Sequence, residues 1–143
     1  MLFFASAVLG CSLFPASLDE QKRYISEGHF HARPISRRAF LELWGPPLYE
    51  HVELTQFFPA PNGNYVPAFR MKLGETPPGW DGTIVSDTGD FWGYPERGEL
   101  LGFIEEQLVY REQLSTERIH AIAKKWQFES QFKSRLEFSP GNP

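Results

Sequence analysis

The chain lacks the features that mark disulfide-stabilised, nucleic-acid-binding or membrane-spanning proteins. Its 143 residues include a single cysteine, Cys11, so no disulfide can form within the chain. The 14 basic residues are outnumbered by 18 acidic ones and form no basic block, which argues against nucleic acid as a partner. No apolar run approaches the roughly 20 residues of a transmembrane helix.

Apolar and aromatic residues, in contrast, are plentiful. Hydrophobic residues make up 41% of the chain and aromatic residues 15%, including 13 phenylalanines. This length and composition predict one small domain with a hydrophobic core.

The first charged residue is Asp19, and the residues before it include a short apolar run that ends at Cys11. Val8-Leu9-Gly10-Cys11 resembles the lipobox of bacterial lipoproteins. This resemblance implies that residues 1–10 are a signal peptide, that Cys11 is lipidated and that residues 11–17 form a tether. The positive n-region of such signals is missing, which a start codon placed too late would explain. The alternative is a buried N-terminal strand or helix with an inert thiol.

Ser12 follows the cysteine, as in lipoproteins that are exported to the outer membrane of Gram-negative bacteria. The resemblance therefore implies a periplasm-facing protein that is attached to the outer membrane by its lipid. More than one acyl chain gives stable anchoring.

Capping residues predict two helices in the first third of the chain. Ser17 opens a helix over residues 18–27, and Gly28 ends it. Pro34 and Ser36 open a second helix, which ends at Gly45 before two prolines. Its predicted buried stripe is Phe40, Leu43 and Trp44, while Arg37 and Arg38 are expected at a solvated helix start.

Alternating apolar residues then predict strands over residues 49–58 and 65–73. In the first strand, Val52, Leu54 and Phe58 form the expected apolar face. Asn62-Gly63 favours a hairpin between the strands, and Pro67 puts the second at an edge or a bulge.

Residues 74–98 contain six glycines and three prolines, which predicts a long loop. Residues 100–104 and 108–112 predict a second hairpin, with a single bent strand as the alternative. Ser115 caps a C-terminal helix whose apolar face is Ile119, Ile122, Ala123 and Trp126. The sequence thus predicts an α+β fold: two N-terminal helices packed on an antiparallel β-sheet in two layers, plus a C-terminal helix. The domain spans residues 18–138, and residues 139–143 form a flexible tail.

Two short motifs resemble the BamE (SmpA/OmlA) group of small bacterial lipoproteins across residues 11–112. Ile25-Ser26-Glu27-Gly28 ends the first helix and Leu43-Trp44-Gly45-Pro46-Pro47 ends the second, although Pro34-Ile35 replaces the family's Gly-Met. The resemblance implies two helices on an antiparallel sheet, with glycine and proline shaping the backbone. It also implies a structural function, such as an accessory role in outer-membrane protein assembly or the inhibition of a hydrolase.

Polar residues offer two weaker candidates for chemistry. His29 and His31 flank Phe30 and could chelate a metal, but only His51 and His120 remain to complete a site, so no metal is expected. Five carboxylates of the predicted loop could bind calcium or act as an acid/base pair: Asp81, Asp87, Asp90, Glu96 and Glu99. They match no calcium-loop spacing and lack a nucleophile, so we expect solvated charges. No catalytic residue and no cofactor is predicted.

Aromatic residues of the same segment are the preferred binding residues: Trp80, Phe91, Trp92 and Tyr94. Tryptophan and tyrosine are frequent in binding hot spots. The alternative is that these rings cover an open face of the sheet and complete a small core. The sequence therefore predicts a non-catalytic protein-interaction module, lipid-anchored in the cell envelope. The alternatives are a small-ligand-binding or hydrolase-inhibiting domain and, less favoured, an enzyme that uses loop carboxylates.

Overall fold

The computed structural model describes residues 16–137, with side chains as far as residue 132. Cys11, the signal peptide and the 139–143 tail lie outside the described residues. The elements in chain order are α2 (Leu18–Glu27), α3 (Arg37–Trp44), β1 (Tyr49–Pro59), β2 (Tyr65–Pro67), the 3₁₀ turn η1 (Ala68–Arg70), β3 (Val85–Tyr94), β4 (Glu99–Ile104), β5 (Gln107–Gln113) and α4 (Thr116–Glu137). The α+β class with an antiparallel sheet is confirmed.

Helix α2 begins and ends where its caps predict. The Ser17 hydroxyl accepts a hydrogen bond from the Glu20 amide at 3.2 Å, and Gly28 takes the left-handed conformation with φ of 78°. Glycine adopts this conformation without a Cβ clash, so the chain can turn away from the helix.

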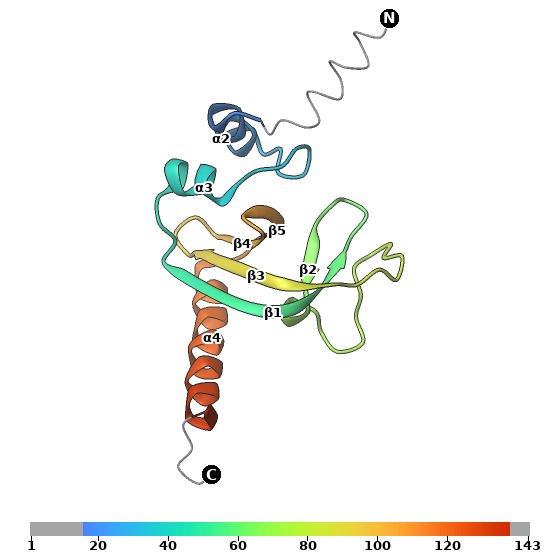
Figure 1. Cartoon of the computed structure of the whole chain (residues 1–143), viewed down its shortest axis with the longest axis vertical. Helices are drawn as coiled ribbons and strands as arrows, with labels where there is room; N and C mark the ends of the chain where they lie inside the picture. Colours follow the sequence, from blue (N-terminus) through green and yellow to red (C-terminus); the bar gives the residue numbers. More distant parts are fainter. Residues whose placement is uncertain (1–15, 138–143) are drawn as a thin grey trace, which may run out of the picture.

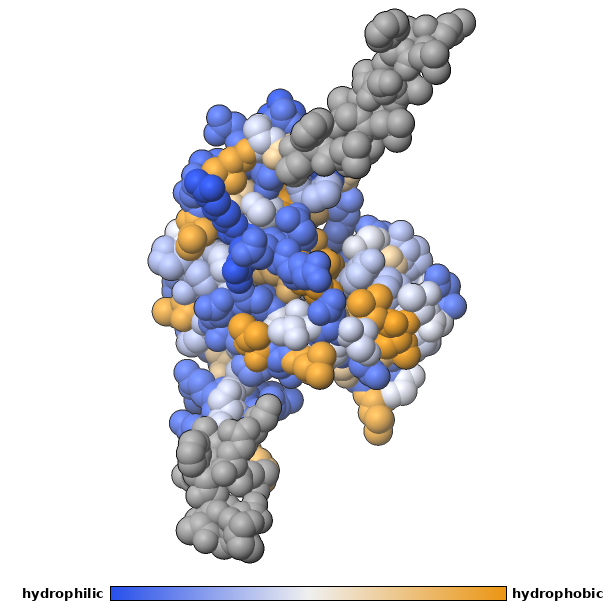
Figure 2. All heavy atoms as spheres, in the orientation of Figure 1, coloured by the Kyte–Doolittle hydropathy of each residue, from blue (hydrophilic) through white to orange (hydrophobic). Residues whose placement is uncertain are grey.

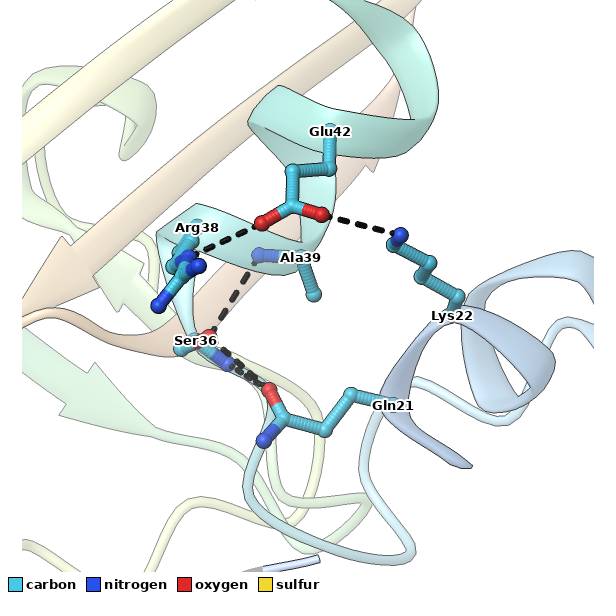
Figure 3. Close-up of polar contacts among 6 residues, drawn as sticks. All are labelled: Gln21, Lys22, Ser36, Arg38, Ala39 and Glu42. Atoms are coloured by element: carbon cyan, nitrogen blue, oxygen red, sulfur yellow. Dashed lines mark hydrogen bonds and ion pairs between the residues drawn. The ribbon is translucent and has the colours of Figure 1, made fainter. Parts of the chain in front are cut away.

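Helix α3 is tied to α2 by side-chain contacts (Figure 3). The Gln21 amide oxygen accepts from both the backbone N–H of Ser36, at 2.7 Å, and its hydroxyl, at 2.9 Å. Glu42 accepts from Lys22 and from Arg38, at 3.0 and 2.8 Å. The two helices therefore form one unit, which lies at one end of the molecule (Figure 1).

The predicted stripe of α3 is only partly buried. Phe40 is fully buried and Trp44 half-buried, but Leu43 is 37% exposed. Leu43 lies in the last turn of this eight-residue helix, whereas the fully buried side chains of Ala39 and Phe40 lie in its first half.

The five strands form one antiparallel sheet in the order β2-β1-β3-β4-β5. Its two outer strands meet: the Asn64 side chain, next to β2, accepts from the backbone N–H of Arg111 in β5 at 2.9 Å and donates to its carbonyl at 3.2 Å. The sheet is therefore curved in a barrel-like manner. For this reason the predicted two-layer packing is not confirmed.

Both faces of the curved sheet contribute to a core. On one face, α2 and α3 share a cluster with side chains of β3 and β4, including Trp92, Tyr94 and Phe103. On the other face, Phe57 and Phe91 pack in a cluster with Trp126 of α4. The predicted apolar face of the C-terminal helix is thereby confirmed, because Ile119, Ile122, Ala123 and Trp126 are all buried.

Two predicted element boundaries in the middle of the chain are wrong. The strand expected over residues 65–73 stops at Pro67, where the chain enters η1, because proline has no N–H to continue the ladder. The loop expected over residues 74–98 contains the ten-residue strand β3, which pairs with both β1 and β4. The irregular segment therefore ends at residue 84.

The hairpin between β4 and β5 is confirmed, with the turn at Glu105 and Glu106. None of the helices within residues 16–137 combines the length and the apolar character that a membrane crossing requires.

Candidate functional site

The four aromatic residues predicted to bind a partner do not lie on one surface. Phe91 is fully buried on the α4 side of the sheet, whereas Trp92 and Tyr94 are buried on the α2–α3 side. Trp80 is the exception, since it lies in the irregular segment, half-buried, with its ring edge-on to Phe58 at 5.5 Å. Three of the four rings thus complete the core, and only Trp80 borders open surface.

The carboxylates of the predicted loop are also separated. Glu99 is 5% exposed and forms a two-pronged ion pair with Arg111, while Asp90 is paired with Arg37. Asp87 and Asp81 accept backbone N–H groups of nearby residues, and Glu96 is exposed. Each buried carboxylate is satisfied by an arginine, which leaves no acidic cluster of the kind that calcium binds.

The histidines have unrelated surroundings. His51 stacks on Trp126, with ring centroids 5.0 Å apart, and burial lowers its pKa. His120 Nδ1 lies 2.6 Å from the Tyr49 hydroxyl oxygen. Within the part of the chain that the structure describes, no three His, Cys, Asp or Glu side chains are grouped to hold a metal ion.

A polar cluster lies where α3 meets the sheet. The Trp92 indole N–H donates to Glu50 at 3.0 Å and to Asp90 at 3.2 Å. Arg37, the first residue of α3, donates to Asp90 at 2.6 Å and to Glu106 at 3.0 Å. This cluster forms one side of a hollow of about 390 Å³ that is also lined by Leu41.

Burial sets the electrostatics of the cluster. Burial and a hydrogen bond to the neighbouring Glu50 carboxyl both raise the pKa of Asp90. Their combined effect exceeds that of the Arg37 guanidinium, which lowers this pKa. The hydrogen bond to Asp90 raises the pKa of Arg37 further. The charges are therefore paired with one another, and no nucleophile lies among them.

Next to the hollow, one face of the sheet carries exposed apolar side chains. Val52 is 58% exposed and Leu54 is 76% exposed, which corrects the prediction that they face the core. Instead, the odd-numbered residues of β1 point towards α4, and Phe57 among them is fully buried. Hydrophobic areas lie along the course of β1 in Figure 2, surrounded by hydrophilic ones.

We name this surface the open face. Its members are outward residues of two paired strands, all exposed: Val52, Leu54 and Gln56 of β1, and Ser86 and Thr88 of β3. Leu54 lies opposite Thr88, and Val52 lies opposite Asp90 of the polar cluster. Helix α3 bounds the open face at one end, and Trp80, packed on Phe58, bounds it at the other.

Sequence reasoning missed Glu50 and Arg37 because their contacts join residues 42 and 53 positions apart. The sequence does contain a weak indication for Arg37, because it is the basic residue closest to the cap of α3. Arg38 does lie at the exposed start of that helix, as expected, where it pairs with Glu42.

No family model matches this chain, and no match was found among curated proteins or solved structures. The resemblance to the BamE group therefore stays a prediction. The glycines of its motif do occupy special backbone positions: Gly28 and Gly45 end α2 and α3 with φ of 78° and 80°. Most residues reach such angles only at a cost, so these glycines serve the fold.

Proposed function

We propose that this protein is a non-catalytic interaction module of the cell envelope that docks a protein partner on the open face. The observation that carries the proposal is the exposure of Val52 and Leu54 in the middle of a paired strand. Neighbouring apolar side chains exposed on a sheet commonly mark an interaction surface.

The surroundings of the open face favour a protein partner. Leu41, 44% exposed, and Trp80 add apolar surface at its two ends. Gln56, Ser86 and Thr88 supply hydrogen-bonding groups between the apolar side chains. An apolar centre with polar groups around it is the usual composition of a protein–protein interface.

The polar cluster supports binding over catalysis. Arg37, Asp90, Trp92 and Glu50 hold one another, so their role is to fix α3 against the sheet at the border of the open face. The less favoured function as an enzyme would require a reactive group in the polar cluster, and its residues offer none.

We further propose that Cys11 anchors the module by its lipid, on the periplasmic side of the outer membrane. The lipobox resemblance supports this, and Cys11 precedes the start of α2 by only seven residues. Helix α2 and the far end of α4 lie at opposite ends of the molecule (Figure 1). Anchoring near α2 would turn α4 away from the bilayer, with the sheet between them. An accessory role in outer-membrane assembly fits this arrangement. It also fits the two helices, which form a layer over only part of one sheet face.

Site-specific photo-crosslinking in intact envelopes tests the docking proposal. A photoreactive residue in place of Val52 or Thr88 should give the same discrete adduct, and one in place of Gln127, exposed on α4, should not. Introducing Leu54→Asp should abolish the adduct, because it buries a charge in the interface.

Leu73→Asp is the matched control, since Leu73 is a fully exposed leucine outside the open face. It should leave the adduct unchanged. The proposal is wrong if the open-face positions give no adduct, or if the adduct persists in Leu54→Asp.

A further inference from the structure

A second hollow lies on the other face of the sheet, between η1 and α4. Its volume is about 220 Å³, and its apolar walls are Phe69, Ile122 and Trp126. The rings of Phe69 and Trp126 stand nearly perpendicular, with centroids 5.8 Å apart. Ala121 also lines the hollow, and its small side chain leaves space that a larger residue would fill. The site is distinct from the open face and its argument is independent of the proposed function.

The wall contains an unpartnered donor. Trp126 is 5% exposed, and its indole nitrogen is the buried side-chain polar atom without a hydrogen-bond partner among the described residues. Buried tryptophan N–H groups usually have an acceptor. The nitrogen itself is enclosed by protein atoms, so its resonance reports changes in the surroundings of the Trp126 ring that lines the hollow.

The rim is positively charged on the α4 side. Arg118 and Lys125 both line the hollow, seven residues apart, which puts them on the same side of the helix two turns from each other. Neither takes part in the ion pairs found among the described residues. Arg70, also on the rim, is already bound to both carboxylate oxygens of Glu112.

One acidic residue, Glu129, completes the rim. Its charge also reaches β1, where it adds to the rise in the pKa of Glu53 and partly offsets the burial that lowers the pKa of His51. Three cations, Arg70, Arg118 and Lys125, line the rim against this single carboxylate, and Arg118 lies furthest from it along α4. Arg118 also helps to lower the pKa of Glu112.

We propose that this hollow binds a small organic acid, with its carboxylate at Arg118 and Lys125 and its apolar body against Trp126, Phe69 and Ile122. A planar guanidinium matches a carboxylate in geometry. The size also fits, because an apolar cavity of about 150 Å³ holds a benzene ring. The hollow thus has room for one ring or short branched chain together with its head group.

An NMR titration with phenylacetate tests the proposal, with the indole N–H resonance of Trp126 as the readout. Phenylacetate should shift this resonance in a saturable manner. Phenylacetamide keeps the ring but lacks the charge, and acetate keeps the charge but lacks the ring, so both should bind more weakly.

Variants of α4 separate the contributions of the positive charge and of the open space to phenylacetate binding. Arg118→Gln should raise the Kd for phenylacetate about tenfold, the loss expected for one charge-assisted contact. Ala121→Leu should abolish binding by filling the hollow, and because Ala121 is exposed the variant should fold normally. Lys124→Gln removes a neighbouring cation that does not line the hollow and should leave the Kd within about twofold.

The proposal is overturned if phenylacetate leaves the Trp126 resonance unmoved. It is equally overturned if phenylacetamide binds as tightly as the acid, or if Ala121→Leu binds phenylacetate like the unchanged protein.

Discussion

Glu99 and Arg111 form a two-pronged ion pair that joins β4 to β5. The two carboxylate oxygens of Glu99 lie 2.7 and 2.8 Å from the guanidinium nitrogens of Arg111, and only 5% of Glu99 is exposed. The same guanidinium lies over the ring of Phe30, 3.9 Å from its centroid. This arginine therefore links the sheet edge to the segment between α2 and α3.

Arg111→Met should destabilise the protein by about 3 kcal/mol or more. The substitution keeps an apolar side chain near Phe30 but leaves the Glu99 carboxylate buried without its cation, and breaking a buried pair typically costs about 3–5 kcal/mol. Urea unfolding at neutral pH measures the loss.

Arg38→Met serves as the comparison, because Arg38 pairs with Glu42 on the surface. We expect a loss of about 0–1 kcal/mol there. Equal losses for the two variants would contradict the role given to the buried pair.

Gly89→Ala should destabilise the protein by about 1–3 kcal/mol, the usual cost of overpacking. A Cβ at Gly89 would lie 2.7 Å from the Phe91 ring and 2.8 Å from the Phe57 ring. Ser86→Ala, on an exposed position of the same strand, should change stability by no more than about 0.5 kcal/mol. Thermal unfolding of the two variants checks the difference, and similar melting temperatures would speak against the clash.

Gly89 also explains why β3 could not be predicted from the sequence. Glycines usually indicate turns, so six of them within residues 74–98 predict a loop. Gly89 is instead required because two phenylalanine rings occupy the space of its side chain, and this crowding exists only after β1 and β3 pair. The helix caps were predictable because Ser17 and Gly28 act on residues within a few positions of themselves.

The open face was missed for a related reason. Alternation along β1 identifies two faces, but it does not tell which face a helix will cover. His51, a polar residue, lies on the covered side because it stacks on Trp126, 75 positions further along the chain. Val52 and Leu54 are consequently exposed. The alternating apolar pattern, which usually indicates a core face, therefore belongs to a surface here.

Asp90→Asn should change how stability depends on pH. Because the pKa of Asp90 is raised in the folded protein, the folded state holds its proton more tightly than the unfolded state does. The stabilisation from this group is complete below the unfolded pKa of about 3.9 and is lost as the pH rises through the folded value. Asparagine cannot titrate, so the variant should gain stability relative to the unchanged protein as the pH rises through this window.

Urea unfolding at a series of pH values measures this difference. Asp87→Asn is the control, since Asp87 lies on the same strand and outside the polar cluster. The free energy of unfolding is plotted against pH for Asp90→Asn and for the unchanged protein. If the two curves run parallel between the unfolded and the folded pKa of Asp90, this residue does not titrate as described.

Cys11→Ser should release the full-length protein from the membrane when it is expressed in a Gram-negative host. The substitution replaces the thiol that would carry the lipid with a hydroxyl that the lipid transfer does not use. Without acyl chains the protein loses about 0.8 kcal/mol of membrane affinity for each buried CH₂ group. Fractionation by sedimentation, together with the intact mass of the purified protein, measures both anchoring and lipidation. Ser12→Ala, one residue along, should stay with the membrane and retain the lipid mass; if Cys11→Ser sediments with the membrane as well, the anchor is not at this cysteine.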